Sequence, residues 1–178
     1  MSLQDLYQQL ILDHARERHG QGLRDTPDGA AGGTVVAENE QVNPLCGDEV
    51  TVRLVLAPAG ADSTVIRDLS WTGEGCSISQ AATSVLHDLV VGQPVEDALA
   101  LLDAYRQMIR SRGQAEPDEE LLGDAVAFAG VGRHANRVKC AMLGWMAFEA
   151  ALSQASASSD SAPGQDTAER ADTQEVAG

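Results

Sequence analysis

Three cysteines, each in a different sequence environment, are the residues of this chain best suited to chemistry. Cys46 and Asp48 flank a glycine in a loop, Cys76 stands where a helix is predicted to begin, and Cys140 lies on a later predicted helix. Three thiols cannot all pair as disulfides within one chain. Soft thiolates select zinc, copper(I) or iron-sulfur centres over magnesium or calcium, and three sulfurs with one carboxylate suit tetrahedral zinc.

The surroundings of each thiol favour different roles. A helix N-terminus stabilises negative charge, so Cys76 is well placed to ionise, while Gly47 gives Cys46 mobility. Two other interpretations stay open at this point. Free cysteine is often a small core residue, and the separations between the three match none of the compact zinc-finger spacings. A purely structural zinc is also possible, although Asp48 in an otherwise all-sulfur ligand set hints at a site that must open.

Length and composition predict one domain over residues 1–152 and an acidic, low-complexity, disordered tail over residues 153–178. The first residues lack a signal-peptide layout and no run approaches the length of a membrane helix, which predicts no membrane association and a reducing cytoplasm. The net charge of −15 disfavours nucleic acid as a partner, because phosphate binding depends on basic contacts. Docking on a complementary protein surface stays open.

Apolar periodicity predicts an α+β fold in which a small three-stranded antiparallel sheet packs against about five helices. Ser2 is predicted to cap a first helix to about Arg18 whose apolar stripe, from Leu3 and Leu6 to His14, faces the core. Strands are predicted over 34–38, 49–56 and 64–72, and helices over 77–90, 95–112, 117–128 and 136–152.

Four segments of the chain form a specific set of motifs: Leu6-Tyr7-Gln8-Gln9-Leu10-Ile11-Leu12-Asp13-His14, Asn43-Pro44-Leu45-Cys46-Gly47-Asp48, Gly73-Glu74-Gly75-Cys76-Ser77-Ile78-Ser79-Gln80-Ala81, and Arg137-Val138-Lys139-Cys140-Ala141 with Trp145. In this order, over roughly residues 3–150, they resemble the SufU branch of the IscU/NifU N-terminal family. IscU-type scaffolds carry a histidine directly before the third cysteine, where this chain has Lys139. The segment between Cys76 and Cys140 also looks longer than in IscU, and both features favour SufU.

The resemblance implies zinc bound by Cys46, Asp48, Cys76 and Cys140. It implies a sulfurtransferase that accepts persulfide sulfur from a SufS-type cysteine desulfurase and passes it toward the SufBCD assembly complex. In that family the desulfurase is thought to offer a histidine to the zinc and so release the first cysteine, which makes Cys46 the acceptor here. Arg137 matches a family arginine near the site and is expected to support the chemistry electrostatically.

Two alternatives to the sulfurtransferase follow from the same residues. One is a non-enzymatic IscU-type scaffold on which iron, or a transient [2Fe-2S] cluster, occupies the same ligands before transfer. The other is a zinc-stabilised adaptor without sulfur chemistry. The segment His134-Ala135-Asn136 stands where relatives often have an aromatic residue and a proline before the arginine. His134 is close in sequence to Cys140 and is an alternative metal ligand, although an exposed loop histidine is the commoner case. His14 and His87 are expected to be core or surface residues, and His19 a loop residue.

Overall fold

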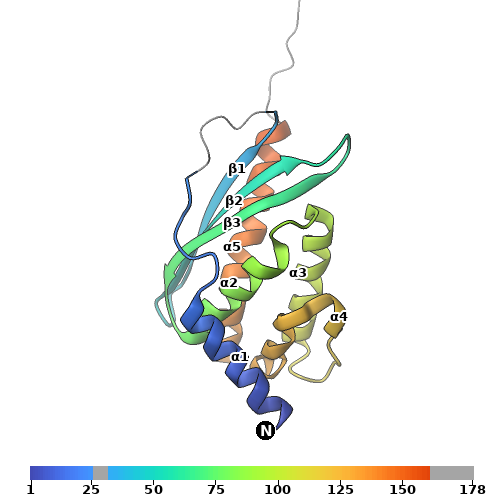
Figure 1. Ribbon diagram of the computed structural model, residues 1–178. Coiled ribbons are helices and arrows are strands. Elements are labelled where there is room, and N and C mark those ends of the chain that lie inside the picture. The colour runs from blue at the N-terminus through green and yellow to red at the C-terminus, as the bar shows by residue number, and fades with distance from the viewer. Residues whose placement is uncertain (26–31, 161–178) are drawn as a thin grey trace, which may run out of the picture.

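The computed structural model describes residues 1–25 and 32–160, which form an α+β fold (Figure 1). Its elements in chain order are α1 (Leu3–Glu17), β1 (Val35–Asn43), β2 (Asp48–Pro58), β3 (Thr64–Glu74), α2 (Ser77–Val90), α3 (Val95–Arg110), α4 (Glu119–Leu122), the 3₁₀ helix η1 (Gly123–Arg133) and α5 (Ala135–Asp160). The strands form one antiparallel sheet in the order β1-β2-β3. The predicted fold class is confirmed.

The central strand β2 shows why the sheet needs helical cover. Its alternating residues Val50, Val52 and Leu54 are at most 1% exposed, as the period-2 pattern predicts. Helix α5 runs behind the sheet and packs against β1 and β2, while α2 packs against α5 and α1 (Figure 1). The sheet and the helices therefore share one core, in which Trp71 and Trp145 are fully buried.

Strand register brings two chain segments together at one end of the sheet. The last pair between β1 and β2 is Asn43 with Asp48, and the adjacent pair between β2 and β3 is Glu49 with Glu74. The β1–β2 turn and the exit of β3 therefore lie side by side. Helix α2 begins directly after that exit, so the loop that carries Cys46 faces the start of α2.

The first helix begins as predicted, but its apolar stripe is only partly buried. Ser2 and Asp5 form a reciprocal capping box at the N-terminus of α1. Ile11 and His14 are buried, whereas Leu3 is 61% and Leu6 51% exposed. The prediction that the whole stripe faces the core is therefore wrong at its first two positions, because the first turns of α1 extend beyond the helices that it packs against (Figure 1).

Two predicted helices have different bounds in the structure. The helix predicted over 117–128 is instead the short α4 followed by η1. Gly123, the first residue of η1, has a positive φ of 48° that ends the α-helix. The sequence predicts that the last helix ends near Leu152, and that boundary is wrong: α5 continues to Asp160, with Ala155 only 4% exposed. The rest of the predicted tail, residues 161–178, lies outside the described residues.

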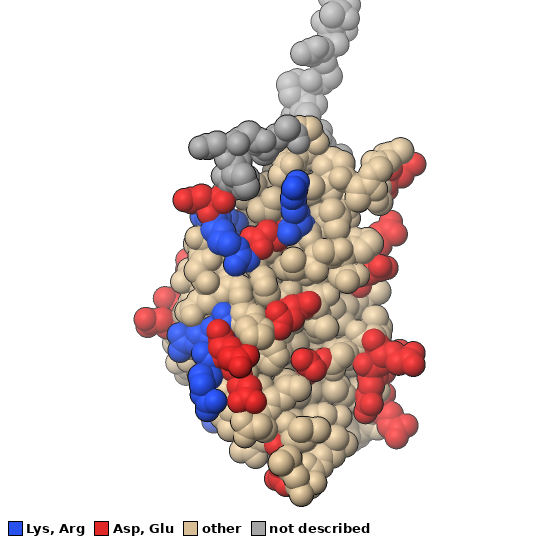
Figure 2. Space-filling model, in the orientation of Figure 1, with Lys and Arg blue, Asp and Glu red and all other residues tan. Residues whose placement is uncertain are grey.

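The surface reflects the acidic composition. On the face shown in Figure 2, acidic side chains are spread widely and basic ones lie mainly along one side. None of the helices among the described residues combines the length and the hydropathy needed to cross a bilayer.

Candidate metal centre

A tight turn between β1 and β2 presents Cys46 to solvent. The backbone carbonyl of Asn43 accepts hydrogen bonds from the N–H groups of Cys46 (3.3 Å) and Gly47 (2.8 Å), and its side-chain Oδ1 accepts one from Leu45 (3.2 Å). Gly47 adopts a φ of 73°, which glycine tolerates without strain. Asn43 itself is buried, while Cys46 is exposed. The turn therefore holds an accessible thiol on an ordered backbone.

Asp48, two residues further on, is a buried carboxylate with one oxygen unpaired. It is 4% exposed, and its Oδ1 accepts a hydrogen bond from the backbone N–H of Cys76 at 3.3 Å. Among the described residues, no group hydrogen-bonds to the buried Oδ2. Burial acts to raise the pKa of Asp48, but hydrogen bonds, chiefly from Cys76, outweigh it and lower that pKa. The group is thus an ionised carboxylate with an oxygen that lacks a partner.

Gly75 is what allows the chain to pass so close to this carboxylate. A Cβ atom built at Gly75 would lie 2.8 Å from Cγ of Asp48 and 2.5 Å from Oγ of Ser79, closer than real Cβ contacts. The next residue, Cys76, is the N-cap of α2, as predicted, and it is half-buried. Its side chain makes no capping hydrogen bond, so the thiol is left available next to Asp48.

Cys140 lies on the buried side of the centre. It is 3% exposed, in the second turn of α5, and its Sγ lies 3.9 Å from Sγ of Cys46. Burial raises the pKa of Cys140 far above the usual range for a thiol, and the neighbouring Cys76 and Cys46 thiols and the Asp48 charge act in the same direction. In the metal-free chain Cys140 is therefore a neutral thiol, and binding a metal there must displace its proton.

The structure brings Cys46, Asp48 and Cys140 together, and Cys76 adjoins this group beside Asp48. One ligand atom each from Cys46, Asp48 and Cys140 lies within 4.8 Å of the other two. Cys76 is outside that close group but touches it through its hydrogen bond to Asp48. Three sulfurs and one oxygen suit zinc, with Zn–S bonds of about 2.3 Å, and the unpaired Oδ2 supplies a lone pair without a competing donor. The residues present therefore fit a zinc ion, and their role as ligands stays a prediction.

Arg137 and His134 are both exposed and line a shallow hollow with Cys76. His134 follows η1, in line with a loop histidine, and it does not belong to the close group of ligand atoms around Asp48. Lys139, directly before Cys140, is exposed and faces a different hollow with Pro44. Arg137 is therefore placed where it can meet a molecule that approaches Cys76.

A second cluster of ligand-type side chains was not predicted from the sequence. His14, His19 and Asp88 each offer an atom within 4.8 Å of the other two. His14 is buried and His19 follows α1, which agrees with the core or surface and loop positions expected for them. Asp88 lies far along the chain on α2, so no local spacing could have connected it with the two histidines.

Comparison with known proteins places this arrangement in a class. The sheet and helices match a NifU-like N-terminal protein from Brucella abortus with a TM-score of 0.68 at 25% identity, covering 87% of this chain and 97% of that one. A structure described as a putative iron-sulfur cluster assembly scaffold protein for the SUF system, from Fervidobacterium islandicum AW-1, matches with a TM-score of 0.61 at 30% identity, covering 85% and 99%. The fold is thus that of the NifU- and IscU-like scaffolds.

Sequence comparison then gives the family. Residues 6–141 match the family described as NifU-like N terminal domain. The iron-sulfur cluster assembly scaffold protein IscU of Streptococcus pyogenes serotype M1 is 35% identical over 84% of this chain and 84% of its own length. The zinc-dependent sulfurtransferase SufU of Bacillus subtilis (strain 168) is 32% identical, over 83% and 90%. The chain belongs to the NifU-like N-terminal domain family of iron-sulfur cluster assembly proteins.

Proposed function

We propose that this protein is a zinc-dependent sulfurtransferase that accepts persulfide sulfur from a SufS-type cysteine desulfurase. The observation that carries the proposal is the contrast within the centre: an exposed thiol, Cys46, lies 3.9 Å from the buried thiol of Cys140. The similarity to a relative named as a zinc-dependent sulfurtransferase supports the same function. Three free cysteines suit a compartment that keeps thiols reduced, which we take to be the cytoplasm.

Zinc would be held by Cys46, Asp48, Cys76 and Cys140. When bound, it keeps the coordinated thiols deprotonated. The chain contributes the fixed part of the site: Asp48 is held by the Cys76 N–H, and Cys140 is anchored on α5. Cys46 is exposed, whereas Cys76 is half-buried and Cys140 buried, so Cys46 is the ligand that can leave and return most easily without unpacking the core.

The transfer conserves atoms and electrons. The Cys46 thiolate attacks the outer sulfur of the donor's cysteine persulfide, a new S–S bond forms on Cys46, and the donor's S–S bond breaks. The donor cysteine departs as a thiolate and takes a proton from solvent. Arg137, exposed beside Cys76, provides a positive charge for the anionic persulfide as it approaches. The sulfur would then pass to a downstream SufBCD-type assembly complex.

The test is a single-turnover transfer assay. The protein is incubated with a cysteine desulfurase and L-cysteine, and thiols are alkylated and mapped by peptide mass spectrometry. We expect one added sulfur on Cys46 and none in the Cys46→Ser variant, with desulfurase turnover stimulated only by the wild-type chain. Sulfur found on Cys76 or Cys140 instead, or unimpaired transfer by Cys46→Ser, would contradict the assignment of the acceptor.

The second candidate is a scaffold that holds a [2Fe-2S] cluster as cargo on the same four residues. It is favoured by the relative at 35% identity, which is named an iron-sulfur cluster assembly scaffold protein. Anaerobic reconstitution with iron and sulfide separates the two candidates. A stable cluster with visible absorption that transfers to an apo-ferredoxin supports the scaffold, whereas retained zinc and no cluster supports the sulfurtransferase.

A further inference from the structure

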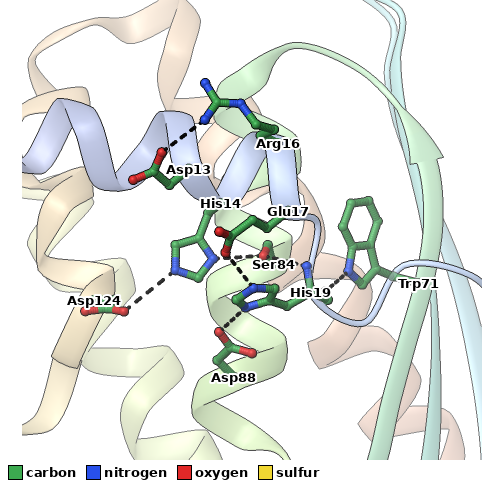
Figure 3. A network of polar contacts seen from close by, with 9 residues as sticks. All are labelled: Asp13, His14, Arg16, Glu17, His19, Trp71, Ser84, Asp88 and Asp124. Atoms are coloured by element: carbon green, nitrogen blue, oxygen red, sulfur yellow. Dashed lines mark hydrogen bonds and ion pairs between the residues drawn. The ribbon is translucent and has the colours of Figure 1, made fainter.

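Side chains from three helices and the segment after α1 converge around two histidines (Figure 3). One ligand atom from each of His14, His19 and Asp88 lies within 4.8 Å of the other two, and the two imidazole rings meet edge to face with centroids 5.0 Å apart. Glu17 lies 2.9 Å from Nε2 of His19, and an oxygen of Asp124 lies 3.7 Å from Nε2 of His14. Two imidazoles are thus surrounded by three carboxylates.

The backbone around His19 is fixed from both sides. Its N–H donates to Oγ of Ser84 at 2.9 Å, and its carbonyl accepts from Nε1 of Trp71 at 2.7 Å. Ser84 Oγ also lies 2.8 Å from Nδ1 of His14, so a single α2 hydroxyl positions both histidines. These contacts fix the ring of His14 and the backbone of His19 before any ion binds, and groups that surround metal ligands commonly have such a role.

His19 has the arrangement of a histidine ligand backed by a carboxylate. Its Nε2 faces Glu17, while its Nδ1 lies 2.5 Å from Oδ2 of Asp88. At that separation Nδ1 and the Asp88 oxygen share a proton in the metal-free chain, and Glu17 holds the other ring nitrogen. A metal ion that replaces this proton leaves the Nε2–H donating to Glu17, as in carboxylate–histidine–metal triads.

The local charge and the freedom of these side chains also favour a cation. Arg16 is paired with Asp13 and points away from the histidines, so it does not neutralise Glu17, Asp88 or Asp124 (Figure 3). A metal ion makes bonds of about 2.0–2.2 Å to nitrogen and oxygen ligands. To bind one ion together, Nδ1 of His19 and Oδ2 of Asp88 must therefore separate from 2.5 Å to roughly 3.3 Å. The side chains of His19 and Asp88 are 38% and 39% exposed, so both can make that small movement without disturbing the core.

We propose that His14, His19 and Asp88 form a second metal site that binds a divalent transition-metal ion, with Glu17 orienting His19 and Asp124 as the nearest further carboxylate. Imidazole and carboxylate ligands suit zinc, cobalt(II) or nickel(II) and lack the thiolates of the first centre. Asp88 and Cys76 lie at opposite ends of α2, roughly 18 Å apart at 1.5 Å per residue. The two sites therefore bind metal separately, and the second does not depend on sulfur transfer.

The test uses cobalt(II) as the probe, titrated into the full-length protein under reducing conditions. Cobalt bound to thiolates gives an intense charge-transfer band, and cobalt bound to imidazole and carboxylate gives only weak visible bands. We expect two ions per chain, of which one adds no charge-transfer absorption. His19→Gln and Asp88→Asn should each weaken that ion's binding at least about tenfold and leave the thiolate band intact.

The matched control is Asp97→Asn, an exposed aspartate on α3 outside the cluster, which should keep both ions. Thermal unfolding of each metal-free variant checks that it is folded. Because His19→Gln and Asp88→Asn are independent substitutions, the test still works if one of the two variants does not fold. Saturation at one ion per chain with the full thiolate band, or an ion without that band that survives both His19→Gln and Asp88→Asn, would overturn the proposal. Either result leaves the thiolate band, and with it the test of the first centre, unaffected.

Discussion

Cys46 and Cys140 lie 3.9 Å apart yet belong to two different kinds of structure. Cys46 is exposed on a turn held by the hydrogen bonds of Asn43, whereas Cys140 is 3% exposed on a helix that packs against the sheet. Moving the first costs a few loop contacts, while moving the second disturbs the core. Under the proposed function, this difference would let one centre hold a metal on its buried side and offer a reachable thiol on its exposed side.

Cys140→Ser is the change with the largest expected effect on this contrast. It removes a sulfur ligand and places a hydroxyl in a buried position, so we expect loss of stoichiometric zinc and about 1 kcal/mol less stability in the metal-free protein. Cys46→Ser, at an exposed position, should change metal-free stability by no more than about 0.5 kcal/mol. Denaturant unfolding in the presence of a chelator measures the stability of both metal-free variants. Equal destabilisation by the two substitutions would contradict the claim that Cys140 is part of the core and Cys46 is not.

Asp48→Asn tests the fixed side of the centre without changing its shape. The amide can still accept from Cys76 through Oδ1, but the unpaired Oδ2 becomes an NH₂ group that cannot bind a cation. Zinc affinity, measured by competition with a chromophoric chelator, should fall by about tenfold or more. The matched control is Glu49→Gln, which neutralises the neighbouring exposed carboxylate and should leave affinity unchanged.

Gly75→Ala sharpens the comparison by crowding the buried side of the centre, at Asp48 and Ser79, and not the exposed turn. The added methyl would lie 2.8 Å from Cγ of Asp48, so the carboxylate must shift. Overpacking of this kind costs about 1 kcal/mol, which corresponds to roughly fivefold weaker zinc binding in the same competition assay. Gly130→Ala, whose nearest neighbour would be Nε2 of Gln4 at 3.8 Å, is the control expected to show no change.

Asn43→Ala tests the exposed side and should have the smallest effect. It removes the side-chain hydrogen bond to Leu45, but the backbone carbonyl still holds Cys46 and Gly47. We expect about 0.5–1 kcal/mol lower stability in thermal or denaturant unfolding and a change in zinc affinity of no more than about twofold. A loss of zinc as large as that of Asp48→Asn would mean that the turn, rather than the buried side, sets the affinity.

Sequence patterns predicted the parts of the fold that depend on local periodicity. The alternation in β2 and the helix start at Cys76 are both confirmed. The patterns failed where tertiary packing decides which residues are buried. Leu3 and Leu6 follow the helical stripe, but nothing among the described residues covers them fully. Ala155 is buried, although a small residue of this kind gives no clear apolar signal in the sequence. An 11-residue 3₁₀ helix, η1, also has no clear sequence signature.

The site could be predicted as a set of residues but not as a geometry. Separated cysteines meet because Glu49 pairs with Glu74, which puts the start of α2 beside Asp48, and because α5 packs across β1 and β2. These are long-range contacts that no spacing rule contains. The histidine cluster was missed for the same reason, since Asp88 reaches His19 only once α2 packs on α1.

The most direct test of the central claim reads metal and sulfur on the same molecule. Native mass spectrometry of the zinc-loaded protein, after incubation with a cysteine desulfurase and L-cysteine, reports both, and fragmentation locates the sulfur. Our account predicts that zinc is retained while one sulfur is added at Cys46. Zinc retained with no added sulfur, or sulfur added only to chains that have lost zinc, would contradict it.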